Sequence, residues 1–305
     1  MTRILLFLTI LSALFSEASY AQPLVCRQRG GYPMPTPAAA SRQRMEAQLE
    51  KARIEHLASP GDAESLLWLG RRQAYLGLYH DAIDTYGKGL QLHPNDARFL
   101  RHRGHRQLTL RCLDNAVDDL TKASKMIKGQ PDQVEPDGMP NERNIPTSTL
   151  QSNIWYHLGL AHYLKGDYGK AVKAYKSCLK VSKNNDMFAA TANWYHLALR
   201  KDGRTKAAAR FLKSIDPSMA LIENEDYLAI LTLYIERTDP EKALQRLRER
   251  KELSSASYGY GLGEYLLSRG DRKGAADVFK RITADSTNWS SFGYMAAEKT
   301  LYELR

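Results

Sequence analysis

Alanines that recur at a nearly constant interval are the feature that most limits what this chain can fold into. Each of them lies five residues after a glycine, or after an arginine or threonine in the equivalent place. The successive intervals are 34, 55, 37, 35 and 32 residues, between Ala82, Ala116, Ala171, Ala208, Ala243 and Ala275. The longest interval equals 34 plus 21 residues, so one unit carries an insertion. A period of this length predicts an array of similar units rather than a single globule.

A second set of small residues indicates what each unit is. Apolar residues recur at i, i+3 and i+4 spacing, as amphipathic helices require, around Gly70, Gly104, Gly159 and Gly263. A glycine where two helices meet, opposite an alanine, lets the helices approach closely. Each unit is therefore predicted to contain closely packed amphipathic helices. Because one unit cannot bury its own apolar stripe, neighbouring units must stack.

The four letters Trp-Tyr-His-Leu occur twice, beginning at Trp155 and at Trp194, 39 residues apart. Both copies are followed by a glycine and then by the alanine-bearing helix pattern. We interpret the two tryptophans as occupants of the same packing position in adjacent units.

These residues resemble the tetratricopeptide repeat (TPR), a 34-residue unit of two helices. The best copy, at residues 152–185, has Trp155, Leu158, Gly159, Gly166, Asp167, Tyr168, Ala171 and Tyr175 in the family's pattern. Further copies fall at residues 63–96, 97–128 and 256–289, with degenerate ones near 187–214 and 224–251. The resemblance implies an all-α, right-handed TPR-like α-solenoid of about six helix pairs, with N- and C-terminal capping helices.

The chain is predicted to divide into seven segments. They are a signal peptide (1–21), a flexible linker (22–40), an N-terminal capping helix (41–58), TPR-like repeats 1 and 2 (59–128), a Pro-rich insertion (129–149), TPR-like repeats 3 to 6 (150–289) and a C-terminal capping helix (290–305). Four prolines forbid a continuous helix in the insertion. It could be a hinge between two halves of the solenoid, a flap near the groove, or a tolerated surface insertion.

The first residues predict export. Arg3 precedes an apolar run at residues 4–15, and small residues lead up to Ala21. This pattern is typical of a secretory signal peptide cleaved after Ala21, and the run is too short to span a bilayer. A retained membrane anchor and a lipid attached at Cys26 are the alternatives. We expect a periplasmic or secreted protein with no transmembrane segment after cleavage.

Three cysteines, Cys26, Cys112 and Cys178, leave at least one thiol unpaired within an exported chain. In the repeat frame Cys112 and Cys178 lie at opposite ends of the helix pairs, on the order of 14 Å apart, which is too far for a disulfide. Cys26 could reach Cys112 or another chain. Neither the cysteines nor the histidines have metal-ligand spacing, so we expect no metal and no cofactor.

The resemblance also implies which side chains line the concave groove of the solenoid. The first two repeats place a basic cluster there, formed by Arg71, Arg98, Arg101 and His105. The third repeat places an aromatic and apolar surface beside it, formed by Tyr156, Leu160 and Tyr163. Guanidinium groups match carboxylates through paired hydrogen bonds, so the groove is predicted to bind an acidic or C-terminal peptide segment. The alternative is a solvated basic face in a chain of net charge +10.

Some relatives that bind chaperones carry a carboxylate clamp of lysine, asparagine and arginine at fixed repeat positions. At those positions this chain has Leu67, Arg71, His102, Asn153 and His157. The family's clamp is therefore predicted to be absent.

Catalytic motifs are absent from the sequence: it has no Gly-x-Ser-x-Gly elbow, no His-Glu-x-x-His motif and no paired catalytic carboxylates. The prediction is a non-enzymatic scaffold that binds another protein or peptide of acidic character. The alternatives are an enzyme or regulatory subunit with a site near residues 129–149, and a binder of an anionic envelope polymer. Nucleic acid is disfavoured for an exported chain whose basic residues are spread along its length. The oligomeric state is not predicted.

Overall fold

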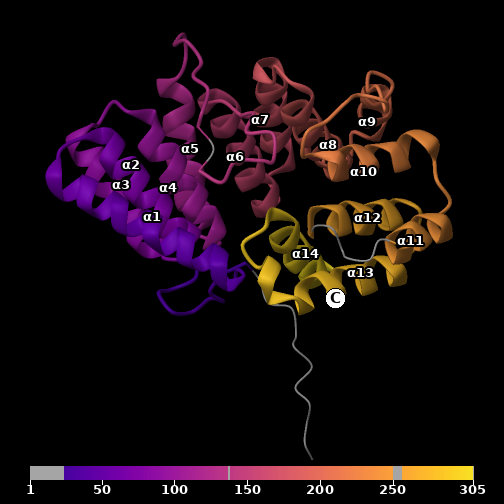
Figure 1. Cartoon of the computed structure of the whole chain (residues 1–305). Coiled ribbons are helices and arrows are strands. Elements are labelled where there is room, and N and C mark those ends of the chain that lie inside the picture. Colours follow the sequence, from indigo (N-terminus) through magenta and orange to yellow (C-terminus); the bar gives the residue numbers. More distant parts are fainter. Residues whose placement is uncertain (1–23, 137, 250–255, 305) are drawn as a thin grey trace, which may run out of the picture.

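The computed structural model describes residues 24–136, 138–249 and 256–304, and only the backbone of residues 246–249. Most helices in this part form six consecutive pairs (Figure 1). The pairs are α2 (Ala63–Tyr75) with α3 (Tyr79–Leu92), α4 (Ala97–Thr109) with α5 (Leu113–Met126), α6 (Leu150–Lys165) with α7 (Tyr168–Val181), α8 (Asn185–Lys201) with α9 (Thr205–Leu212), α10 (Glu225–Glu236) with α11 (Pro240–Glu249), and α12 (Ala256–Ser268) with α13 (Arg272–Ala284).

Additional helices stand at both ends of this array. α1 (Ala39–Ala58) packs on α2, and α14 (Phe292–Glu303), after a short 3-10 helix η1 (Ser286–Asn288), packs on α12 and α13. The predicted all-α solenoid of about six helix pairs with a capping helix at each end is confirmed.

The close approach inside each pair depends on the recurring glycines. A Cβ atom built on Gly70 would lie 2.4 Å from the Tyr86 ring, and one on Gly263 would lie 2.2 Å from the Phe279 ring. Gly104 and Gly159 meet Leu120 and Tyr175 in the same way, again 16 residues further along the chain. Only a residue without a side chain leaves room for the large residue of the second helix, so the repeat spacing follows from packing.

The turn inside a pair requires a left-handed backbone. Gly77, Gly166, Gly203 and Gly270 have φ between 75° and 86°, a region that glycine enters without steric cost. Arg111 takes the same place in the second pair with φ 62°, which is unfavourable for a residue with a side chain. The fold must therefore gain something from the Arg111 side chain.

That gain is the closure of the array. The solenoid curls so that α12, α13 and α14 lie under α6 to α8 in the view of Figure 1. The buried guanidinium of Arg111 donates to the Trp289 carbonyl at 2.9 Å and to Glu298 Oε2 at 3.0 Å. Its central carbon also lies 3.8 Å from the Trp289 ring centroid. A turn of the second repeat thus holds the start of the C-terminal cap.

The N-terminal segment joins this closure. A disulfide links Cys26 to Cys112, which is one of the two pairings left open by the sequence. The Tyr32 ring stacks on Trp289 with centroids 5.5 Å apart, and Arg27 pairs with Glu298. Residues 24–38, expected as a flexible linker, therefore lie against the folded array. The third cysteine is free and buried.

The interpretation of the two tryptophans is wrong. Trp155 is half-buried, whereas Trp194 is 1% exposed and packs between Tyr163 and Tyr260, with centroids 5.2 and 5.6 Å away. The reason is the register: the motif repeats after 39 residues, but the alanines of these two units repeat after 37. A shift of two residues turns a side chain by about 200° around an α-helix, so the two copies face different neighbours.

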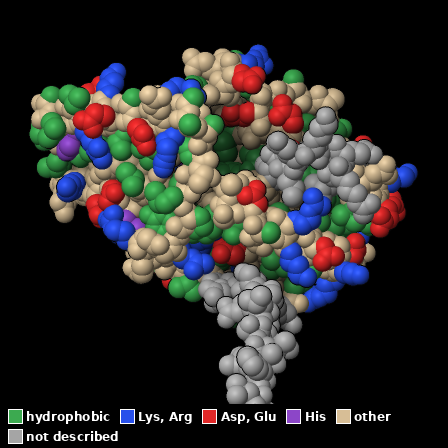
Figure 2. Space-filling model, turned by 60° about the horizontal axis from the view of Figure 1, so that its bottom comes forward, with side chains coloured by type: hydrophobic (Ala, Val, Ile, Leu, Met, Phe, Trp, Pro, Cys, Tyr) green, Lys and Arg blue, Asp and Glu red, His purple; other side chains and the backbone are tan. Residues whose placement is uncertain are grey.

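Within the described ranges, no helix combines the length and the apolar character that crossing a bilayer would require. On the face drawn in Figure 2, basic and acidic side chains are interspersed, and a hollow near the centre of the view exposes apolar side chains.

Candidate functional site

The concave face of the first three repeats has two halves that differ in chemistry. We call the first the basic half: it comprises Arg71 of α2 with Arg101 and His102 of α4. We call the second the aromatic half: it comprises Tyr156, Leu160 and Tyr163 of α6. Both halves contact other parts of the same chain, and the two contacts are built differently.

The basic half holds a carboxylate from the insertion. Glu135 is 9% exposed although it belongs to a loop. Arg101 Nε lies 3.1 Å from Glu135 Oε2, and His102 Nε2 lies 3.0 Å from Oε1. Asn153 Nδ2 of α6 donates to Oε2 at 2.7 Å. Side chains from two neighbouring repeats therefore converge on a single acidic group.

The protonation states in this cluster follow from the contacts. An Arg101 N–H faces His102 Nδ1 at 3.0 Å, and because a guanidinium can only donate, the His102 proton sits on Nε2 and points at Glu135. Burial, with the charge of Arg101, lowers the pKa of His102 to about 4. Burial alone would raise the pKa of Glu135, but Arg101 and His102 outweigh it and hold that pKa well below its ordinary value. The arrangement is an ionised carboxylate, a guanidinium and a neutral imidazole.

The residues after Glu135 are held through their backbone. Arg71 Nη2 donates to the Pro136 carbonyl at 2.5 Å, and Arg72 Nη1 donates to the Gly138 carbonyl at 2.9 Å. Both guanidinium groups also lie over the Trp68 ring, at 4.3 and 4.8 Å from its centroid. These contacts recognise carbonyl groups, which any extended peptide supplies.

The positions of the family's carboxylate clamp take part in this contact. His102 and Asn153 approach the Glu135 carboxylate, and Arg71 binds the next carbonyl. The family's lysine and asparagine pattern is absent, as the sequence shows, yet a carboxylate is held at these positions. In this chain histidine, asparagine and the adjacent Arg101 hold one.

Arg98, also predicted for the groove, lies outside this cluster. Its guanidinium pairs with Asp96 at 2.6 Å and also with Glu64. Arg98, Gln133 and Leu150 line two adjoining cavities of about 140 and 910 Å³. Together these cavities form an outer groove that begins at Trp68 and runs past Arg98 to the end of α5.

The aromatic half is covered by helices. Leu160 is fully buried, and the hydroxyls of Tyr156 and Tyr163 pair with those of Tyr227 and Tyr260 at 3.3 and 2.7 Å. Burial raises the pKa of Tyr163 well above its ordinary value, so this contact is between neutral phenols. The three residues are therefore part of the core in this conformation.

His105, the remaining predicted site residue, lies between the two halves. Its ring centroid is 4.2 Å from that of His157 and 5.5 Å from that of Phe292 at the start of α14. Burial lowers the pKa of His105 well below its ordinary value and that of His157 to about 3. His105 is thus a neutral packing residue against the C-terminal cap.

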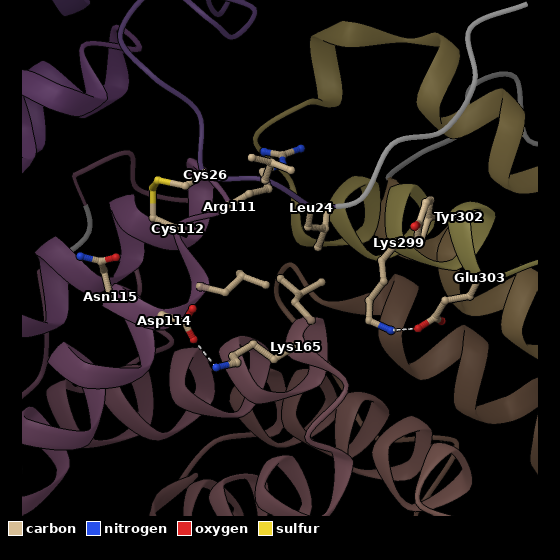
Figure 3. Close-up of a pocket in the computed structure, with 13 residues that line it drawn as sticks. Leu24, Cys26, Arg111, Cys112, Asp114, Asn115, Lys165, Lys299, Tyr302 and Glu303 are labelled. Carbon is tan, nitrogen blue, oxygen red and sulfur yellow. Dashed lines mark hydrogen bonds and ion pairs between the residues drawn. A yellow bond between two sulfur atoms is a disulfide. The ribbon is translucent and has the colours of Figure 1, made fainter.

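A third cavity, of about 550 Å³, lies where the two ends of the array meet (Figure 3). Its walls come from the N-terminal segment with the disulfide, from α5 and α6, and from α14. Both lysines in Figure 3 are paired, Lys165 with Asp114 and Lys299 with Glu303, and Arg111 pairs with Glu298. Because each lysine already has a carboxylate partner, the cavity offers little charge to a ligand.

In the part of the chain that the structure describes, no three His, Cys, Asp or Glu side chains gather as a metal site would require.

The sequence analysis identified the cationic residues of the basic half but missed Glu135, Arg72 and Trp68. Glu135 is one acid in a Pro-rich insertion, and nothing local indicates that it folds back. A tryptophan followed by two arginines, Trp68 to Arg72, was a signal that could have been used.

Comparison with known proteins agrees with this architecture. Residues 152–185 match the family model "Tetratricopeptide repeat". A tetratricopeptide repeat protein from Parabacteroides merdae ATCC 43184 is 17% identical with a TM-score of 0.50, over 87% of this chain and 93% of that one. MamA is 17% identical with a TM-score of 0.44, over 65% of this chain and 95% of that one.

YrrB, described as a TPR protein with an unusual peptide-binding site, is 14% identical with a TM-score of 0.44, over 82% of this chain and 96% of that one. No curated protein matches the chain. The match at residues 152–185 shows one tetratricopeptide repeat, and the likeness to the Parabacteroides merdae protein agrees with a solenoid fold of the tetratricopeptide-repeat type.

Proposed function

We propose that this protein is a non-enzymatic scaffold that works outside the cytoplasm and binds an acidic segment of another protein along the basic half of its concave face. Tetratricopeptide-repeat proteins are generally protein-interaction scaffolds, and some bind peptides. The observation that carries the proposal is the way Arg71, Arg101 and His102 hold a carboxylate and a carbonyl of an extended segment. Such a surface suits a peptide ligand.

The location outside the cytoplasm is supported by two features. The N-terminal pattern is that of a secretory signal peptide. The Cys26–Cys112 disulfide joins residues 86 positions apart, and disulfides of this kind persist in oxidising compartments such as the periplasm or the extracellular space.

The outer groove beside Arg98 is the accessible part of this surface. The Arg98 side chain is 31% exposed, and of its two acidic partners Glu64 is 58% exposed and Asp96 19%. An exposed ion pair contributes little to stability, so an incoming carboxylate can replace Glu64 at small cost while Asp96 keeps Arg98 in place. A partner segment would first meet the protein here.

Charge reversal at Arg98 tests the proposal. Affinity capture from the cell envelope, quantified by mass spectrometry, should recover partners with the unchanged chain, and Arg98→Glu should lower their recovery at least tenfold. Lys176→Glu is the matched control, because Lys176 is exposed on α7 away from the groove. Equal recovery with Arg98→Glu and with the control would remove the outer groove, and with it the proposed route onto the basic half, as the binding surface.

A further inference from the structure

The insertion is not needed to connect the helix pairs that it separates. α5 packs directly on α6, as α3 packs on α4 and α7 packs on α8. Those other two connections use only residues 93–96 and 182–184, whereas the connection from α5 to α6 uses residues 127–149. Because the stacking continues through this junction unchanged, the extra residues must be explained by something other than the geometry of the solenoid.

The part of the insertion that enters the concave face is extended and is held like a bound peptide. Glu135 N donates to the Ser148 carbonyl at 3.2 Å, next to a single antiparallel bridge between Val134 and Thr149. Helix side chains on the other side supply the remaining contacts, to the Glu135 carboxylate and to the Pro136 and Gly138 carbonyls. The helices thus bind one carboxylate and two backbone carbonyls of the insertion, and the side chains that bind them come from three successive repeats.

The contact is polar and leaves the apolar core intact. Val134, Met139 and Ile145 are 66%, 59% and 42% exposed, so the large apolar side chains of the insertion face solvent. Lifting residues 133–136 out of the groove would break ion pairs and hydrogen bonds but would open no apolar core. These are the interactions that another peptide could replace one for one.

The basic half carries more positive charge than the insertion neutralises. Arg71 and Arg101 are 9% and 8% exposed, and Glu135 is the acidic group that pairs with Arg101. Among the described residues Arg71 has no carboxylate partner, and its Nε makes no hydrogen bond. Arg71 interacts with the Glu135 charge only at longer range, so a ligand with an additional carboxylate would gain a direct ion pair that the insertion does not supply.

We propose that residues 133–136 are an internal ligand, which occupies the basic half in place of an extended partner segment that carries at least one carboxylate. This inference rests on the proposed function and adds two statements to it. The partner supplies a carboxylate to Arg101 and His102 and a carbonyl to Arg71, and it binds by displacing the insertion. When the insertion leaves, Arg101 and His102 lose their carboxylate partner, so an acidic segment that takes its place stabilises the displaced state.

The experiment offers the insertion to the protein as a separate peptide. The probe is a fluorescent peptide of residues 133–140, and the acceptor is the full chain with residues 133–146 replaced by Gly-Gly-Ser-Gly. Four residues span up to about 13 Å, and the N-cap residue Thr149 of α6 is kept. We expect saturable binding by fluorescence anisotropy. The unchanged chain should bind at least tenfold more weakly, because its own segment fills the site.

The same peptide with Glu135→Gln should bind the shortened chain at least tenfold more weakly, since hydrogen bonds to a charged group are lost. No binding by a shortened chain that keeps its helical circular dichroism would overturn the inference, as would equal binding of the two peptides. If the shortened chain does not fold, Glu135→Gln in the full chain decides: tighter peptide binding supports the inference, and unchanged binding contradicts it.

This assay uses no partner, so its failure is distinct from failure of the proposed function. If the peptide binds the shortened chain but Arg98→Glu leaves partner recovery unchanged, the proposed function fails. If Arg98→Glu abolishes recovery but the peptide does not bind the shortened chain, the internal ligand alone is wrong.

Discussion

The two halves of the concave face are filled by the same chain in two different ways. The basic half is filled by a loop through charges and carbonyl groups, around Glu135. The aromatic half is filled by helices through apolar burial, with Tyr163 and Tyr260 both about 1% exposed. Polar contacts can be exchanged for equivalent contacts with a partner, but an apolar contact that is opened exposes its surface to water. We therefore call residues 133–136, which cover the basic half, the exchangeable filler. We call the helices that cover the aromatic half the permanent filler.

The largest effect is expected in the permanent filler. Tyr260→Ala removes a ring that packs on Trp194, Tyr163 and Phe279. We expect the free energy of unfolding to fall by about 3–5 kcal/mol, as for large aromatic residues cut to alanine in a core. Urea unfolding followed by circular dichroism measures it. A loss below about 1 kcal/mol would mean that the C-terminal helices are not part of the core.

The disulfide should come next, because it secures the N-terminal segment that packs on the C-terminal cap. Cys26→Ser with Cys112→Ser should lower the free energy of unfolding by about 2–4 kcal/mol. Hydrogen exchange should show faster opening in α14, which Arg111 and Arg27 hold through Glu298. Faster opening at residues 133–136 with α14 unchanged would contradict the conclusion that the N-terminal segment secures the C-terminal cap.

Glu135→Gln tests the exchangeable filler. The substitution keeps the shape but removes the charge that Arg101 faces, so the free energy of unfolding should fall by about 2 kcal/mol. Combining it with Arg101→Met should cost less than the sum of the two single changes, since the pair is then removed together. Additive losses in a double-mutant cycle would show that the two groups do not interact.

Acidification should lower the free energy of unfolding through His157, which is buried between the two halves. Burial lowers the pKa of His157 to about 3, whereas the unfolded chain has the ordinary value near 6.5. As pH falls below about 6.5 the unfolded chain takes up the proton first, so stability is lost. Glu135, whose pKa is lowered, adds its own loss only below its ordinary value near 4.5. We expect His157→Phe to reduce the loss between pH 7 and pH 5 by about 2 kcal/mol in urea titrations. An unchanged pH dependence would contradict the buried neutral state.

The smallest effect is expected on the outer side of the insertion. Met139 is 59% exposed, so Met139→Ser should change the free energy of unfolding by less than about 0.5 kcal/mol. A loss like that of Glu135→Gln would show that the outside of the loop is packed, and the contrast between the two sides of the insertion would disappear.

The fold could be predicted from the sequence because the packing inside each helix pair imposes a regular spacing of small and large residues. Gly70 and Gly263 must accommodate the large residue 16 positions later, and this requirement recurs in each well-preserved unit. Arg71 and Arg101 could be placed on the concave face by their repeat positions. Arg71 and Arg101 both contact residues 135 and 136, whereas Arg98 and His105, predicted for the same cluster, lie apart from it.

What fills the two halves could not be derived from the sequence. The return of Trp289 and Glu298 to Arg111 depends on small rotations that accumulate over several repeats, and no local pattern records them. The path of a Pro-rich loop is likewise set by distant contacts, so Glu135 gave no sign of its position. Arg111, which stands where four other repeats have glycine, hinted at a special contact.

Hydrogen exchange of the intact protein tests the central claim most directly, because it measures the free energy of opening at each backbone amide. The amides of Glu135 and Leu150 donate to Ser148 and Gln133 across the insertion, and the amide of Met295 lies in α14. The account predicts that the insertion amides exchange by local opening, at a much lower free energy than Met295, which should open only with global unfolding. Equal opening free energies at the two sites would show that the insertion is as permanent as the C-terminal cap, and the account would be wrong.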